Sequence, residues 1–302
     1  MTTEATLERP LDGVRVLDLA RFIAGPWCCL LLSDLGAEVI KLENPGVGDD
    51  SRQAGPFSNG ESLYFISHNR GKRGITLNLL TQDGVEVFKE VLKISDVVVE
   101  NFRPGVMDSF GLAYPQLREV NPRVILTSIS GFGQDGPYRF RPGFDPIVQA
   151  MGGTQFLTGY EDRPPVRCGV YVADYSAGNY GAMATLAALQ QRNRTGEGQH
   201  VDVSLYDGVI SMMNLPYTLY NTSGEEPMRT ANSYVLGVPI NSYRTKDGYV
   251  AIVASPDPIW KRLADAIGKP EFGADPRYAT RAARIEHRED VDGMIGPWVK
   301  ER

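Results

Sequence analysis

The chain has 302 residues, of which 42% are hydrophobic and 23% are charged, and its formal net charge is −6. This composition is typical of a globular protein, and the length predicts about two domains. A negative net charge argues against nucleic-acid binding, because phosphate backbones attract basic surfaces. No apolar run reaches the ~18 residues that a membrane-spanning helix needs, and the polar N-terminus lacks the apolar core of a signal peptide. We therefore expect a protein that binds neither nucleic acid nor a membrane. Its three cysteines cannot form a disulfide framework, which fits a reducing compartment, the matrix or, as we expect, a cytoplasmic location.

The first part of the chain alternates short β-branched runs with helical patterns. Strands are predicted over residues 14–19, 38–43, 75–79, 96–100, 123–130 and 199–205, and helices over 27–35, 83–93 and 175–191. Strands that are separated by helices predict parallel βαβ units. The expected fold class is therefore α/β, with a large doubly wound parallel sheet.

Beyond Tyr206 the pattern changes to that of a second, smaller α/β domain. The pair Asp247-Gly248 suits a tight turn, so the strands on either side of it should form a hairpin. The predicted elements are strands over 241–244 and 249–254, a helix over 258–267 and helical structure from residue 279 onward.

We predict a large domain over residues 1–205, a linker over 206–222 and a small domain over 223–302. No terminal strand or return segment follows the last helical pattern. The small domain is therefore expected to be incomplete and the chain to be shortened at its C-terminus.

Cysteine and histidine patterns predict neither disulfides nor a metal site. The sequence has three cysteines, of which Cys28 and Cys29 are adjacent, and three histidines that lie far apart. Adjacent cysteines and scattered histidines lack the spacing of metal ligands.

The segment Gly131-Phe-Gly-Gln-Asp-Gly136 matches the G-x-G-x-x-G pattern of dinucleotide-binding proteins and follows a predicted strand. Its context does not fit, because Pro137 and Pro142 interrupt the helix that should follow at once. We favour a glycine-rich loop beside some other ligand.

Basic residues form three groups beside predicted strands: Arg70 to Arg73, Arg103, and Arg139 with Arg141. Each group alone is typical of a solvated turn. Ligands of open α/β sheets, however, bind beyond the carboxyl ends of the strands, where several groups can converge. Together they would suit phosphates.

Asp174 stands directly before the predicted helix of small residues. Taken alone it is typical of an N-cap, a position that favours aspartate. A carboxylate at a helix N-terminus should also have a depressed pKa and stay ionised, as a nucleophile must. Local chemistry alone leaves both roles open.

Ordered motifs extend along nearly the entire chain: Leu11–Asp18, Ala24–Pro26, Gly36–Glu43, Asn69–Arg73, Val99–Gly105, Asn121–Leu126, Ser130–Pro137, Gly143–Asp145 and Thr195–Gln199. In this order they resemble the class III CoA-transferases, the CaiB/BaiF-type family of formyl-CoA transferase and carnitine CoA-transferase. The family fold implied is a large and a small domain in an interlocked homodimer.

The resemblance implies a covalent mechanism, with Asp174 at the position of the catalytic aspartate. Its carboxylate attacks the donor thioester to give an aspartyl anhydride, which the CoA thiolate converts into an aspartyl-CoA thioester; the acceptor acid then reverses these steps. Coenzyme A, or acyl-CoA, is thus a substrate, and no tightly bound cofactor is implied. A small dicarboxylate such as succinate is our preferred donor or acceptor.

The CoA contacts that the resemblance implies are Ile23, Ala24, Leu77, Asn101, Phe102 and Arg103. To these we add Lys72 and Arg73 for the nucleotide phosphates. Two positions that are basic in some members are Asn44 and Leu80 here, which implies a rearranged phosphate site.

Two other functions stay open. The family includes α-methylacyl-CoA racemases, but Phe144 occupies the position of their catalytic histidine and cannot shuttle a proton. A non-catalytic CoA-binding fragment is the second alternative, because the chain ends early. A shielding loop of formyl-CoA transferase corresponds to residues 230–237, which hold one glycine, so we expect neither oxalate nor formate as substrate.

Overall fold

The structure, a computed structural model, describes residues 9–302. The chain forms two compact units. The first, the sheet unit, contains the chain up to Gln155 and Arg167–Gly224; the second, the hairpin unit, contains Phe156–Val166 and Glu225–Arg302. No helix within residues 9–302 is long and apolar enough to cross a membrane.

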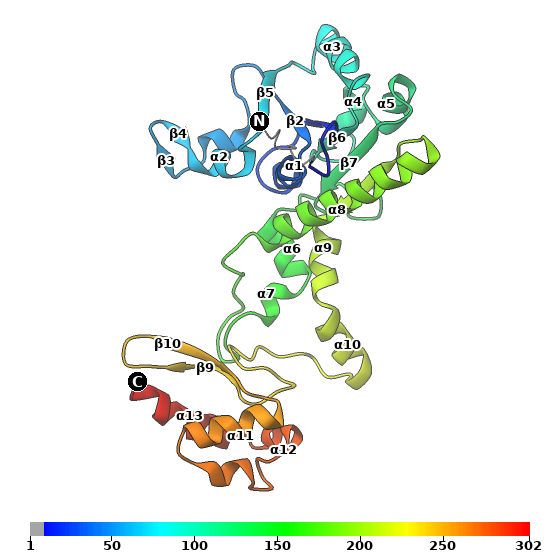
Figure 1. Ribbon diagram of the computed structural model, residues 1–302. Coiled ribbons are helices and arrows are strands. Elements are labelled where there is room, and N and C mark those ends of the chain that lie inside the picture. Colours follow the sequence, from blue (N-terminus) through cyan, green and yellow to red (C-terminus); the bar gives the residue numbers. More distant parts are fainter. Residues whose placement is uncertain (1–8) are drawn as a thin grey trace, which may run out of the picture. The chain divides into compact units, whose positions relative to one another are not determined.

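A six-stranded sheet forms the centre of the sheet unit (Figure 1). Its order is β5-β2-β1-β6-β7-β8, and all neighbouring strands are parallel. The bounds are β1 Arg15–Asp18, β2 Glu38–Glu43, β5 Arg73–Thr76, β6 Val97–Glu100, β7 Ile125–Ser130 and β8 His200–Ser204. The predicted α/β class with a parallel sheet is confirmed.

The strand order reverses between β1 and β6, which makes the gap beyond their carboxyl ends the topological switch point. Open α/β sheets bind their ligands at such points, because the loops that leave the two strands turn in opposite directions. The fold alone therefore directs attention to the loops after Asp18 and after Glu100.

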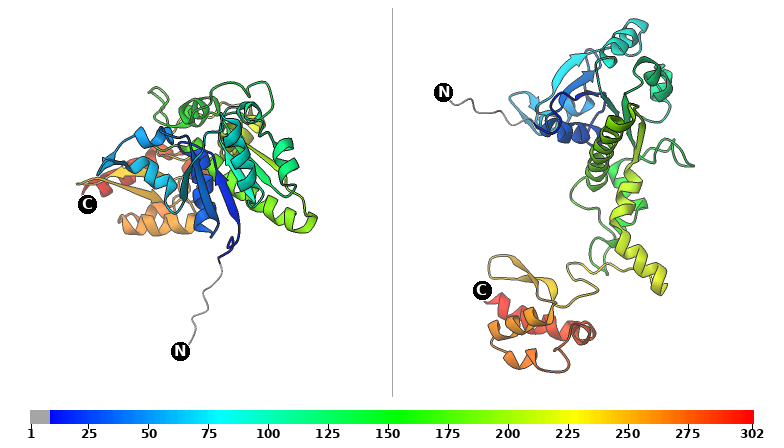
Figure 2. Two further views of the ribbon diagram at one scale, coloured as in Figure 1. Left: turned by 90° about the horizontal axis from the view of Figure 1, so that it is seen from above. Right: turned by 45° about the vertical axis from the view of Figure 1, so that its right-hand side comes forward.

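Helices cover both faces of the sheet (Figures 1 and 2). Side chains alternate across each strand, so Leu17 and Val98 pack with Phe88 of α3 and Leu117 of α5 in one core. On the other face lie α1 and the long helix α8. The helices are α1 Ala24–Asp34, α2 Leu63–Asn69, α3 Gln82–Leu92, α4 Val106–Ser109, α5 Tyr114–Val120, α6 Asp145–Met151, α7 Thr154–Leu157 and α8 Val172–Thr195.

The small residues of α8 serve helix packing. A Cβ atom on Gly178 would lie 2.7 Å from the backbone oxygen of Ala24, and one on Gly181 would lie 2.8 Å from Ile129 Cδ1. Glycine thus allows α8 to approach both α1 and the sheet closely. This contact also brings the first turn of α8 to the switch point.

Residues 206–222, predicted as a linker, are mostly helical and belong to the sheet unit. They lie in α9, Leu205–Met212, and α10, Asn214–Ser223. The smaller elements of this unit are a 3-10 turn, η1 Asp50–Gln53, and a short hairpin of β3 Phe57–Ser58 and β4 Glu61–Ser62.

The hairpin unit contains the predicted antiparallel pair, β9 Ile240–Arg244 with β10 Tyr249–Val253. Its core gathers Val238, Trp260, Tyr278 and Ile295. The remaining elements are α11 Asp257–Ala266, η2 Pro270–Gly273, α12 Arg281–Glu286 and α13 Arg288–Lys300.

Candidate active site

A cleft of about 490 Å³ opens at the switch point of the sheet unit. Its walls come from the loops after β1 and β6, the end of β7, and the first turns of α6 and α8. The lining residues include Arg21, Phe22, Ile23, Ala24, Tyr64, Asn101, Phe102, Arg103, Phe144, Asp145, Tyr171 and Asp174. Cationic, aromatic and acidic side chains thus meet in one space.

Asp174 lies in the first turn of α8, not at its N-cap. The helix begins at Val172, and the N-cap residue is Tyr171, which makes no side-chain capping bond. The prediction that Asp174 is the N-cap was therefore wrong by one turn, because the helix begins at Val172, before the first polar residue that would favour a cap. The carboxylate is instead free to face the cleft, and among residues 9–302 no group donates a hydrogen bond to it.

Burial raises the pKa of Asp174 to about 7, and the nearby charge of Asp145 acts in the same direction. The expectation of a depressed pKa is wrong, because loss of solvent outweighs the favourable end of the helix dipole. A carboxylate without donors in a shielded cleft is poorly solvated. It is consequently a better nucleophile, when ionised, than one on the surface.

Asp145 holds the first turn of α8 in place. Its Oδ1 accepts a hydrogen bond from the backbone N–H of Ala173 at 2.9 Å, and its Oδ2 accepts one from Gln149 Nε2 at 2.7 Å. Gln149 in turn accepts a bond from the N–H of Cys168 at 2.9 Å. This buried acid fixes the residue directly before Asp174 and was not among the predicted site residues.

The two switch-point loops are tied together by Asn101. Its Oδ1 accepts a hydrogen bond from the N–H of Arg21 at 2.8 Å, and its Nδ2 donates to the Arg21 carbonyl at 2.7 Å. Phe22 then adopts a left-handed conformation with φ of 62°. Such a backbone is unfavourable for phenylalanine, so the contacts around it must hold the loop.

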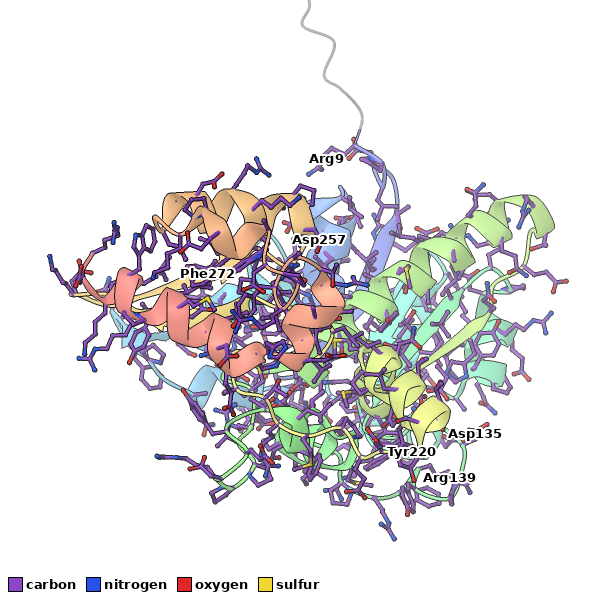
Figure 3. All side chains as sticks on the ribbon, turned by 90° about the horizontal axis from the view of Figure 1, so that it is seen from below. Arg9, Asp135, Arg139, Tyr220, Asp257 and Phe272 are labelled. Atoms are coloured by element: carbon purple, nitrogen blue, oxygen red, sulfur yellow. The ribbon has the colours of Figure 1, made fainter. Side chains whose placement is uncertain are left out.

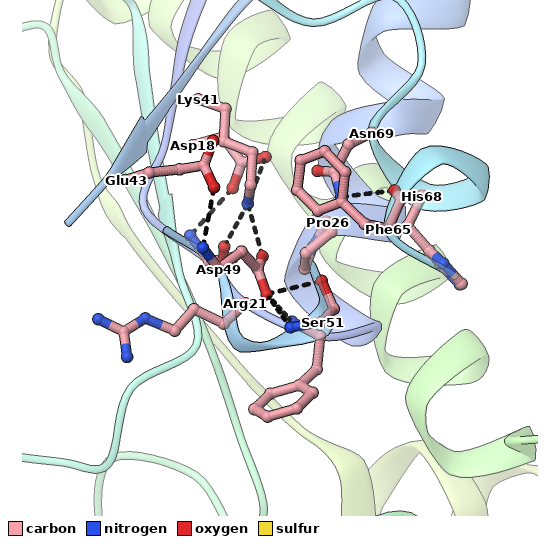
Figure 4. A network of polar contacts seen from close by, with 12 residues as sticks. Asp18, Arg21, Pro26, Lys41, Glu43, Asp49, Ser51, Phe65, His68 and Asn69 are labelled. Atoms are coloured by element: carbon pink, nitrogen blue, oxygen red, sulfur yellow. Dashed lines mark hydrogen bonds and ion pairs between the residues drawn. The ribbon is translucent and has the colours of Figure 1, made fainter. Parts of the chain in front are cut away.

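A buried network of two lysines and two aspartates supplies these contacts; Asp18, Lys41 and Asp49 are labelled in Figure 4. Lys41 Nζ lies 2.9 Å from Asp49 Oδ2 and donates to the Ala20 carbonyl at 2.7 Å. Lys72 Nζ lies 2.7 Å from Asp18 Oδ2. All four side chains are almost fully buried, so the network holds the loop after β1 in place.

Tyr64 of α2 also lines the cleft, near Asp174. Burial raises the pKa of its hydroxyl above the ordinary value, and Tyr171 and Asp174 raise it further. The hydroxyl therefore stays protonated and remains a hydrogen-bond donor at neutral pH. His68 of the same helix binds the hydroxyl of Tyr175 at 3.1 Å, which holds α2 against α8.

The model of the family described as CoA-transferase family III matches residues 11–302. The chain belongs to this family. Succinyl-CoA–D-citramalate CoA-transferase of Chloroflexus aurantiacus is 44% identical over 293 residues, which cover 96% of this chain and 73% of that enzyme. Acetyl-CoA:oxalate CoA-transferase of Acetobacter aceti is 40% identical, with coverage of 97% and 76%.

Solved structures agree with this assignment. A CaiB/BaiF family protein from Brucella suis superposes with a TM-score of 0.86 at 40% identity and covers 97% of this chain and 79% of its own. The family and the enzyme class that the motifs predicted, a CoA-transferase, are therefore confirmed.

In this class III CoA-transferase most of the predicted site residues come together. The cleft is lined by Ile23, Ala24, Asn101, Phe102, Arg103 and Asp174. Leu77 lines an adjoining cleft of about 210 Å³, together with Asn44 and Leu80. The two clefts share the lining residues Arg21 and Phe102, so they lie next to each other.

Lys72 and Arg73 line neither of these clefts. The ammonium of Lys72 directs its three protons to Asp18, to the Pro26 carbonyl at 2.9 Å and to Asn69 Oδ1 at 2.8 Å. Arg73 is exposed on the edge strand and pairs with Glu38 at 3.0 Å. With these three bonds made, Lys72 has no proton left for a phosphate, so the geometry does not support the predicted phosphate contact.

Glu100 positions the loop after β6. This buried carboxylate accepts a hydrogen bond from the N–H of Phe102 at 2.7 Å, and burial raises its pKa to about 7 against the opposing effect of a bond from Ser128. We expect Glu100→Ala to raise the KM for acyl-CoA about tenfold, since the loss of a hydrogen bond to a charged group costs roughly 1.5–3 kcal/mol. Steady-state kinetics would measure it.

Glu100→Gln is the matched control, because its amide oxygen can still accept the bond from Phe102. We expect its KM to stay close to that of the native chain. A Glu100→Ala variant with unchanged KM would contradict the positioning role.

Proposed function

We propose that this chain transfers CoA from an acyl-CoA donor to a carboxylic acid, with Asp174 as the covalent nucleophile. The observation that carries the proposal is the Asp174 carboxylate, free of hydrogen-bond donors, in a cleft at the switch point. The residues proposed to bind CoA are Ile23, Ala24, Leu77, Asn101, Phe102 and Arg103.

The reaction proceeds through two anhydrides and one thioester. The Asp174 carboxylate attacks the donor thioester carbonyl, expels the CoA thiolate and becomes an acyl-aspartyl anhydride. The thiolate attacks the aspartyl carbonyl, which releases the donor acid and leaves an aspartyl-CoA thioester. The acceptor carboxylate attacks that thioester to form a second anhydride, and the thiolate then takes the acceptor acyl group and frees Asp174.

Each intermediate would be lost to hydrolysis if water reached it. The aromatic side chains of Phe22, Phe102, Phe144 and Tyr171 line the cleft, and we propose that bound acyl-CoA packs against them and displaces water from Asp174. Tyr64 also lines the cleft, and we propose that its protonated hydroxyl donates a hydrogen bond to the carbonyl oxygen as negative charge develops on that oxygen.

A small dicarboxylate such as succinate is the proposed donor or acceptor acid. Relatives of 40–44% identity are named for succinyl-CoA with citramalate, malate or glutarate, which supports this choice. The relative from Acetobacter aceti is named for acetyl-CoA and oxalate, so oxalate belongs among the acceptors to test despite the single glycine in residues 230–237.

Covalent transfer is favoured over racemisation by Phe144. This residue lines the cleft directly before Asp145 and carries no group that could remove an α-proton. We further propose that the chain acts in the cytoplasm and that it forms a homodimer. Light scattering of the purified protein would test the homodimer.

A trapping experiment tests the proposal. The chain is incubated with succinyl-CoA and hydroxylamine, and peptides are analysed by mass spectrometry. We expect a hydroxamate on Asp174, because hydroxylamine captures aspartyl anhydrides and thioesters. CoA transfer to a panel of carboxylic acids without any modification of Asp174 would contradict the mechanism, and solvent exchange of an α-proton without transfer would favour a racemase.

A further inference from the structure

Three arginines converge beside the candidate active site. Arg103 follows β6, and Arg139 and Arg141 lie in the loop between β7 and α6, where Arg139 is labelled in Figure 3. All three line one cleft of about 110 Å³. This cleft, the arginine cleft, shares Asn101, Phe102, Arg103 and Phe144 with the larger cleft that holds Asp174.

The charges of these arginines are not compensated by the protein. Within residues 9–302, Arg103, Arg139 and Arg141 form no ion pair with a carboxylate. Most other arginines of the sheet unit do, including Arg21 with Asp50, Arg52 with Glu43 and Arg70 with Asp34. Like charges that gather in one cleft without counter-ions raise the local concentration of anions.

The loop between β7 and α6, residues 131–144, is held in shape by its own contacts. Gly131 and Gly143, near the two ends of this loop, are in contact: a Cβ atom on Gly131 would lie 2.6 Å from the Cα of Gly143. The guanidinium of Arg141 stacks on Tyr138, 4.0 Å from the ring centroid, and Tyr138 packs edge-on against Phe132. A stacked guanidinium keeps its N–H edge free for an oxyanion.

We propose that Arg139 and Arg141, together with Arg103, form a binding site for an oxyanion group of a substrate. The group is the diphosphate of CoA or the free carboxylate of a dicarboxylic acid, since guanidinium binds both in the same bidentate manner. The inference rests on the proposed function. These arginines would take over phosphate binding from the two positions that are basic in some family members and are Asn44 and Leu80 here.

Titration calorimetry on the full chain tests the site without requiring turnover. The variants are Arg141→Gln and Arg139→Gln, with Arg194→Gln as the matched control, because Arg194 is also exposed but lies in the last turn of α8. The probes form two pairs. CoA is compared with pantetheine, which lacks the diphosphate, and succinate is compared with butyrate, which lacks the second carboxylate.

A diphosphate site predicts that both variants raise the Kd for CoA about tenfold and leave that for pantetheine unchanged. A carboxylate site predicts the same contrast between succinate and butyrate. If both variants match Arg194→Gln for every probe, or if the native chain binds neither CoA nor succinate, the inference is overturned. A native chain that binds these ligands but transfers no CoA would refute the proposed function and leave the arginine site standing.

Discussion

Replacing Asp174 by asparagine is expected to lower the rate of CoA transfer by a factor on the order of 10⁴ or more, as when a covalent nucleophile is removed. Asparagine keeps the shape of the side chain, but its amide cannot form an anhydride. The measurement is the initial rate of thioester exchange between succinyl-CoA and a dicarboxylate. Asp83→Asn is the matched control, because Asp83 also lies in the first turn of a helix, α3, but faces solvent.

The same substitution should stabilise the protein at alkaline pH. The pKa of Asp174 is raised to about 7, so the folded state holds this proton more tightly than the unfolded chain does. Below the ordinary pKa of aspartate this proton contributes its full stabilisation. That stabilisation is lost as the pH rises from there through the folded-state pKa of about 7. At pH 8 the asparagine variant should therefore unfold at a higher temperature than the native chain.

These two readouts distinguish a nucleophile from a structural residue. If Asp174 were a structural residue, its substitution would destabilise the protein. If it is a nucleophile held in an environment that disfavours its charge, the substitution lowers activity and raises stability. The transfer rate of the native chain should also rise through pH 7, because only ionised Asp174 attacks. Full transfer activity in Asp174→Asn would exclude the covalent mechanism.

The positions of the strands could be predicted because their buried segments are rich in β-branched residues such as Val, Ile and Thr. Val97–Glu100 and Ile125–Ser130 are fully buried runs, and both were predicted within two residues of their observed start. The edge strand β5 was predicted to begin at Ile75 but begins at Arg73, since an exposed strand need not be apolar. Strand topology then identified the loops that line the cleft.

The electrostatics of the site could not be predicted from local sequence. Asp145, which helps to raise the pKa of Asp174, reaches Ala173 across 28 residues of chain. The partner of Lys72, Asp18, lies 54 residues away, so a basic turn could not be distinguished from a buried ion pair. The one available signal was Asp145 itself, an acid within the ordered motif Gly143–Asp145.

Replacing Lys72 by methionine is expected to destabilise the chain by about 3–5 kcal/mol, the usual cost of removing one partner from a buried ion pair. Burial opposes ionisation of Asp18, yet the charges of Lys41 and Lys72 hold its pKa below the ordinary value. Without Lys72, the nearest ammonium is that of Lys41, 3.9 Å away. Urea unfolding of the native chain and the variant would measure the difference.

Arg73→Met is the matched control for this variant. Arg73 adjoins Lys72 in the chain, but its ion pair with Glu38 is exposed and should contribute less than about 1 kcal/mol. A second substitution, Asp18→Asn, should cost less in the Lys72→Met background than in the native chain, because it removes the charge left unpaired. If Lys72→Met unfolds like the native chain but binds CoA more weakly, Lys72 is a phosphate ligand, and the network in Figure 4 does not hold the active-site loop.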